Sequence, residues 1–157
     1  FEIKNSLIKR MFGVMEEGLD VLPMVRFLDK LLANPKQGVV DELYPFLEHN
    51  DIKISESGDI LAFRSVTLDF KDHHTGLMDN SIGSVVSMPR TLVDNDPDRT
   101  CSSGLHVASW DYASTFGSNK RLVSVEVNPT DVVSIPRDYN GSKMRCCKFE
   151  VLTEVHL

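Results

Sequence analysis

The spacing of the apolar residues changes once along this chain, near residue 50. Before that point apolar side chains recur every three or four positions, and from Asp51 onward they alternate with polar ones. A period of 3.6 is typical of an amphipathic helix and a period of two is typical of a half-buried strand. The change therefore predicts an α+β fold, with a helical segment over residues 1–50 and a β-rich domain over residues 51–157.

The helical segment is predicted to form three short helices. Gly18 and Asp20 break the first from the second, and the third begins at Asn34-Pro35, with Asn34 as its N-cap and Pro35 in the first helical position. Pro45 lies inside the third apolar stripe, where it should kink or shorten the helix. The stripes could dock a partner or another copy of the chain, or cover the following sheet, and covering the sheet is favoured. The first two stripes contain Ile3, Leu7, Ile8, Met11, Phe12 and Met15, then Met24, Val25, Phe27, Leu28, Leu31 and Leu32.

The β-rich domain is predicted to contain one short helix among its strands. Ser109 can accept a hydrogen bond as the N-cap of a helix that runs to Phe116, with Ala113 and Phe116 on one face. Pro, Gly and Asn residues mark the turns between the strands. The predicted strands cover residues 52–54, 60–66, 84–88, 105–108, 121–127, 132–135 and 145–152.

Charge and cysteine content exclude several classes of protein. The net charge of −6 and the scattered lysines and arginines argue against a nucleic-acid partner, because phosphate binding needs a basic surface. No run of 18 apolar residues is present to span a membrane. The three cysteines are an odd number without a CxxC pair, and Cys146 and Cys147 are adjacent. This pattern favours free thiols in a reducing compartment over disulfides or a zinc site.

An acidic cluster has the spacing of the first ligands of a calcium loop. Asp94, Asp96 and Asp98 match that spacing, but Arg99 stands where the loop needs glycine and Leu105 where it needs glutamate. A solvated acidic turn is therefore the favoured interpretation, and no metal site is predicted.

Three strands each carry a single polar or charged residue in an apolar run: Arg64, His106 and Glu150. Taken singly, each can be a solvent-facing residue or, for His106, a hydrogen-bonded core histidine. Together they could converge on one cleft, because burial of such groups requires partners, water or a ligand. Asp72, His73 and His74 could contribute to a metal site, but the adjacent histidines lack a third spaced ligand, and the segment is interpreted as a polar loop.

A series of motifs from residue 42 to residue 152 identifies a family resemblance. The motifs are ELYPFLEHN (42–50), GDILAFRSV (58–66), NSIGSVVSMPR (80–90), CSSGLHVAS (101–109) and VNPTDVVSIPRDYNGSKMRCCKFEVL (127–152). In this order the chain resembles, nearly end to end, the C-terminal part of the rapid-lysis B (RIIB) proteins of T-even-like phages.

The resemblance implies a phage accessory protein that modulates lysis or escape from host exclusion through protein contacts. It implies a phage or host protein as partner, with a homo-oligomer as a further arrangement. It also implies the host cytoplasm as the location, with a membrane-peripheral or virion-associated place as alternatives. A structural component of the virion is a separate alternative function.

A second resemblance concerns the fold of the β-rich domain. The order FRSV, GLHVASWDYASTF and KFEVL is similar to the three core motifs of the ADP-ribosyltransferase superfamily. This resemblance implies a split sheet and an NAD-type cleft, with Arg64 on phosphate, His106 on a ribose hydroxyl and Glu150 stabilising an oxocarbenium-like transition state. Ser109 and Phe116 would join Arg64 in binding the cofactor, NAD. The alternative function is therefore a nucleotide binder or a transferase.

Overall fold

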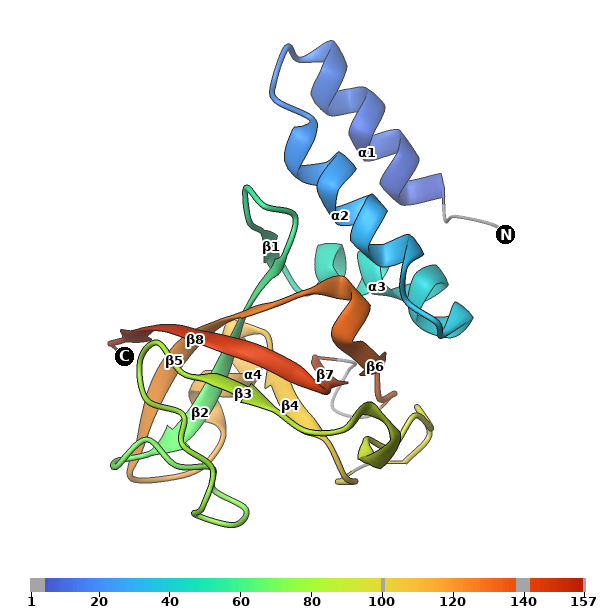
Figure 1. The fold of residues 1–157 in the computed structure, drawn as a ribbon. Helices are drawn as coiled ribbons and strands as arrows, with labels where there is room; N and C mark the ends of the chain where they lie inside the picture. The colour runs from blue at the N-terminus through green and yellow to red at the C-terminus, as the bar shows by residue number, and fades with distance from the viewer. Residues whose placement is uncertain (1–4, 100, 138–141, 157) are drawn as a thin grey trace.

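The computed structural model describes residues 5–99, 101–137 and 142–156. Three helices come first: α1 (Asn5–Glu16), α2 (Leu22–Leu32) and α3 (Gln37–His49). Figure 1 shows α1 and α2 as a hairpin that stands away from the sheet, while α3 lies closer to it. Contacts agree with this view, because α1 packs against α3, and α2 packs against the turn after the fifth strand.

The strands that follow form one antiparallel sheet, and the α+β prediction is confirmed. The strand order is β3-β8-β5-β2-β4-β7-β6, with β1 paired to β2. The predicted strand 145–152 is wrong in one respect, because it is divided at Cys147 into two strands that lie apart in the sheet. The strands are β1 (Lys53–Ile54), β2 (Ile60–Thr67), β3 (Val85–Ser87), β4 (Leu105–Ala108), β5 (Lys120–Val127), β6 (Val132–Ser134), β7 (Lys143–Cys146) and β8 (Lys148–Val155).

Short helices connect several strands of the sheet. The predicted helix after β4 is confirmed as α4 (Trp110–Thr115), and the Ser109 hydroxyl accepts its cap hydrogen bond from the Tyr112 N–H at 3.3 Å. Two 3₁₀ helices follow β3 and β5: η1 (Arg90–Leu92) and η2 (Pro129–Asp131).

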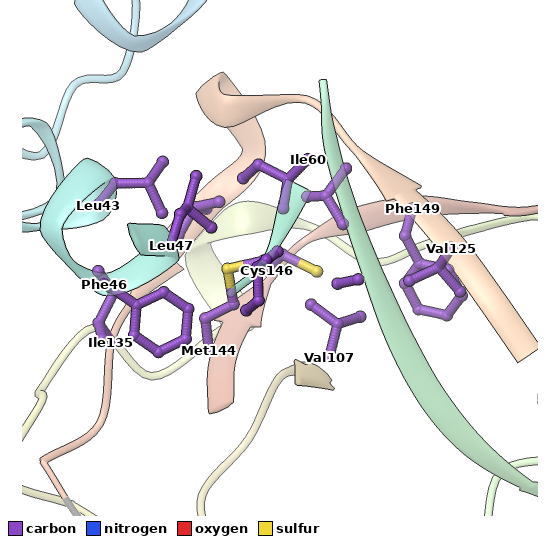
Figure 2. Close-up of a cluster of buried hydrophobic side chains, with 14 of the residues drawn as sticks. Leu43, Phe46, Leu47, Ile60, Val107, Val125, Ile135, Met144, Cys146 and Phe149 are labelled. Atoms are coloured by element: carbon purple, nitrogen blue, oxygen red, sulfur yellow. The ribbon is translucent and has the colours of Figure 1, made fainter. Parts of the chain in front are cut away.

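Each face of the sheet is covered by a different part of the chain. Alternation along β5 sends Val123 and Val125 into the large core shared with the helices, while Leu122 packs on the opposite face with Ala113 of α4. Figure 2 shows side chains of α3 (Leu43, Phe46 and Leu47) beside residues of the sheet such as Ile60, Met144 and Cys146. The helical stripes therefore do cover the sheet, although several of their apolar residues stay exposed.

The junction between α2 and α3 differs from the predicted one. Lys36 is the N-cap of α3, so Asn34 does not cap it and Pro35 precedes the helix. The Asn34 amide instead donates to the carbonyl oxygens of Pro129 and Val132, at 2.8 Å each, and its oxygen accepts from the Lys36 N–H. Because Asn34 is buried, these bonds satisfy polar groups where the helical segment meets η2 and β6.

Pro45 does not end α3, which continues to His49. Of the helices that the structure describes, none is both long enough and apolar enough to cross a membrane.

Candidate functional site

Arg64 lies on β2 in the middle of the sheet, and its guanidinium donates hydrogen bonds to other parts of the chain. Its Nε donates to the Asn80 side-chain oxygen at 3.0 Å, and its Nη1 donates to the His106 carbonyl oxygen at 2.7 Å. The guanidinium also lies 5.2 Å from the centre of the Phe149 ring. Burial lowers the pKa of Arg64 from its usual value. Arg64 thus joins β2, β4 and the loop after β2 through hydrogen bonds and a cation–π contact.

The loop that Arg64 holds is folded around a second buried polar group, Asp72. The Asp72 carboxylate accepts from the backbone N–H groups of Thr75, Leu77 and Met78 at 2.7, 3.1 and 2.9 Å. Burial by itself raises the pKa of this carboxyl, but the hydrogen bonds from Thr75 and Met78 outweigh it and hold the pKa at about 2. Hydrogen bonds to Asp72 therefore stabilise the loop between β2 and β3 internally.

Replacing Asp72 should destabilise the protein in a pH-dependent way. We expect Asp72→Asn to lower the free energy of unfolding at pH 7 by about 1–3 kcal/mol, because buried N–H donors lose an ionised acceptor. The folded pKa of about 2 lies below the ordinary 3.8, so this stabilisation is complete above pH 5 and is lost as pH falls from about 4 to 2. Urea unfolding of both proteins between pH 7 and pH 3 measures it.

Asp29→Asn is the matched control for that experiment, because Asp29 is exposed on α2. It should change the free energy of unfolding little at either end of the pH range. A difference between wild type and Asp72→Asn that stays constant with pH would contradict the ionised-acceptor role.

His106 lies on β4, next to β2, but its side chain points to the other face of the sheet from Arg64. The register pairs Phe63 with Ala108, which places Arg64 opposite Val107. Consistent with this, Val107 packs in the large core with Ala62 and Val66, whereas Ala108 packs under α4. Because side chains alternate along a strand, His106 lies on the α4 side.

Glu150 is exposed on β8. It alternates with Phe149, whose ring lies under Arg64, so Glu150 points to the opposite face from Arg64. It shares a face with His106, but three strand spacings separate β8 from β4, which amounts to about 14 Å. The structure therefore does not bring Arg64, His106 and Glu150 into one cleft, and the expectation of side chains on one face is wrong.

The two further residues assigned to a cofactor, Ser109 and Phe116, have positions in and after α4. The Ser109 hydroxyl is used as the N-cap. The Phe116 ring stacks on Tyr112 at 5.9 Å between ring centres and meets the edge of His73 at 5.7 Å. Neither residue lies on the Arg64 side of the sheet, because α4 covers the opposite face.

Ser65 and His73 form a pair that sequence reasoning missed. The Ser65 Oγ lies 2.9 Å from His73 Nε2 and also donates to the Phe116 carbonyl oxygen at 2.9 Å. A serine has one hydroxyl proton, and a carbonyl can only accept, so His73 Nε2 must be the donor to Ser65. Burial, and then the charges of Arg64 and Lys120, lower the pKa of His73. In this tautomer His73 cannot activate Ser65 as a nucleophile.

A second arginine, Arg145 on β7, holds the acidic loop of residues 94–99. Its side chain is 0% exposed. The guanidinium donates to the carbonyl oxygens of Asp94, Asp96 and Arg99 at 3.0, 2.5 and 2.9 Å, and to the Ser134 hydroxyl at 3.3 Å. A guanidinium thus takes the carbonyl oxygens that a cation would need.

The carboxylates of the same loop are engaged as well. Asp94 accepts from the Ser102 hydroxyl at 2.5 Å, which is the main reason that its pKa is lowered to about 2. Asp98 pairs with Arg137 at 2.6 Å. Among the residues that the structure describes, no group of three or more His, Cys, Asp or Glu side chains could hold a metal ion.

The cysteines are free thiols in the structure, as the sequence predicts. Cys146 and Cys147 are buried in different apolar clusters, and Cys101 is exposed. Burial raises the pKa of Cys146 to about 12, so this thiol is not a nucleophile at neutral pH.

The fold and the site define an α+β protein with a helical hairpin beside an antiparallel sheet, in which two arginines, Arg64 and Arg145, hold loops and do not line an open cleft. The family described as Bacteriophage T4 protein rIIB matches residues 3–156. Protein rIIB of Enterobacteria phage T4 is 46% identical over 155 residues, which is 98% of this chain and 50% of that protein. The chain belongs to the rIIB family, and it spans about half the length of this curated relative.

No solved structure matches this chain. The resemblance to the ADP-ribosyltransferase fold therefore stays a prediction.

Proposed function

We propose that this chain acts through protein contacts in the infected cell, as part of an RIIB-type accessory protein that modulates lysis or host exclusion. One observation carries the proposal: the α1–α2 hairpin holds large apolar side chains in solvent. They are Phe12, Met15, Leu19, Leu22, Val25 and Leu32. Exposed apolar residues gathered on one projecting unit are typical of a protein-binding surface.

The internal use of the polar residues supports the same proposal. The groups that an NAD-type site would need lie on different faces or far apart, and Arg64 is bonded to the protein. No observation favours the transferase or the virion alternative. The contact partner is a phage or host protein in the cytoplasm of the host, at its membrane surface or in an assembling particle.

The test is a phage that carries Leu22→Asp and Val25→Asp in this chain. Both side chains are exposed on α2, so the protein should still fold while an apolar contact there is lost. We expect an altered lysis time, or failure to grow on a host with an exclusion system. The control is Leu77→Asp, at a position that is 82% exposed on the loop after β2. Normal lysis and normal growth of the α2 variant would contradict the proposal.

A further inference from the structure

The helix α1 carries two parallel apolar stripes. The inner stripe faces the core: Leu7 belongs to the large core, Met11 packs against that core, and Val14 is buried. The outer stripe, here called the α1 seam, continues into the turn after the helix and consists of Ile8, Phe12, Met15 and Leu19. Of these, Phe12, Met15 and Leu19 are 61%, 56% and 57% exposed. In Figure 1, α1 lies on the part of the molecule away from the sheet. The exposure of Phe12, Met15 and Leu19 leaves the α1 seam accessible to a partner.

The spacing of the α1 seam is that of a coiled-coil interface. Within α1, Ile8, Phe12 and Met15 follow one another at intervals of four and three residues, and Leu19 lies in the turn beyond the end of the helix. Apolar residues with this alternation lie in a narrow line along a helix and pack between the side chains of a second helix. The inner stripe already serves the contact with α3, so the α1 seam is a second line that a helix of another molecule can fit.

The charges beside the α1 seam indicate which helix that is. Lys9 and Glu16 are both exposed and are seven residues apart, so they lie on the same side of the seam. When two such helices pack antiparallel, side chains at this equivalent position meet across the interface. In that arrangement, Lys9 of each copy lies near Glu16 of the other, and opposite charges meet twice around a two-fold axis.

From this complementarity we infer that the α1 seam is a self-association surface, at which two copies of the chain pair through antiparallel α1 helices. Phe12 of one copy packs on Met15 of the other, and Ile8 packs near Leu19. The pairing is a symmetric dimer contact, in which the same surface is used by both copies. This inference does not depend on the role in lysis, because it follows from the apolar spacing and the charges of α1 alone.

The dimer is expected to be weak. A helix of 12 residues is about 18 Å long, and a contact of that length lies below the size of standard protein interfaces. We expect a dissociation constant between about 10 and 1000 µM. Sedimentation equilibrium of the chain from 10 µM to 1 mM measures it, and a monomer at all concentrations would overturn the inference.

A substitution of an apolar residue tests the place of the contact. Phe12→Ser should weaken dimerisation by at least about tenfold, since a symmetric interface loses two phenylalanines. Leu77→Ser, at the exposed loop position far along the chain, should leave dimerisation unchanged. Thermal unfolding of each variant confirms that it is folded. A dimer that Phe12→Ser does not affect would show that the contact lies elsewhere and would overturn the inference.

A charge exchange tests the direction of the helices and the identity of the occupant. Lys9→Glu alone, or Glu16→Lys alone, should weaken the dimer about threefold to tenfold. One exposed ion pair contributes little, but the symmetric dimer contains two of them. The double variant Lys9→Glu/Glu16→Lys should restore it, since opposite charges meet again. Failure of the double variant to recover would overturn the antiparallel pairing. If the α1 seam bound only a different protein, the double variant would also fail to restore a dimer.

Discussion

Replacing Arg145 with methionine is expected to lower the free energy of unfolding by about 3–5 kcal/mol. Arg145 is fully buried, and its guanidinium satisfies the carbonyl oxygens of Asp94, Asp96 and Arg99. Methionine fills much of the volume but donates nothing, so three acceptors lose their hydrogen bonds at one point. Urea unfolding followed by circular dichroism measures the change.

Two further variants make that experiment decisive. Arg145→Lys keeps the charge but lacks the planar fork, so its stability should fall between those of the wild type and Arg145→Met. Arg137→Met removes an exposed arginine after β6 that pairs with Asp98 of the same loop, and it should leave the unfolding midpoint nearly unchanged. If Arg145→Met unfolded within about 1 kcal/mol of the wild type, the guanidinium would not be what holds the loop.

Leu31→Ala is expected to lower the free energy of unfolding by about 2–5 kcal/mol. Leu31 is 0% exposed and belongs to the core shared by the helices and the sheet, so its loss leaves a cavity where α2 meets the sheet. The same urea titration measures the effect.

The next residue supplies the control for Leu31→Ala. Leu32 has the same side chain on the same helix but is 45% exposed, so Leu32→Ala should cost less than about 0.5 kcal/mol. Equal losses for the two variants would mean that the helical segment does not pack on the sheet as described.

Local patterns determined most of the secondary structure. The change of period near residue 50, the Ser109 cap and the alternation along β5 are properties of neighbouring residues, and each predicted its element correctly. The junction at Asn34-Pro35 was predicted wrongly because Asn34 has better partners, in Pro129 and Val132, than the start of α3. Such partners lie about a hundred residues away, where local rules cannot find them.

The candidate site was predictable as a set of unusual residues but not as an arrangement. The sequence singled out an arginine, a histidine and a glutamate in apolar strands as groups that burial would require to have partners, and Glu150 is exposed in the structure. The face of the sheet on which each side chain lies depends on the register of β2 against β4 and on the position of β8. Neither is encoded in a single strand. Arg145 could have been found from the same signal, because it stands between Met144 and Cys146 in a buried strand.

The sequence by itself determined the fold class, the free cysteines and the membership of the rIIB family, because each depends on composition, on short-range spacing or on similarity along the chain. Only the tertiary structure decided what the buried charges do. A guanidinium in an apolar strand can bind a ligand or hold a loop, and the distances from Arg64 and Arg145 to carbonyl oxygens of distant segments show that these two hold loops. The physical reason is that a hydrogen bond depends on positions in space, which strand pairing sets after the local elements have formed.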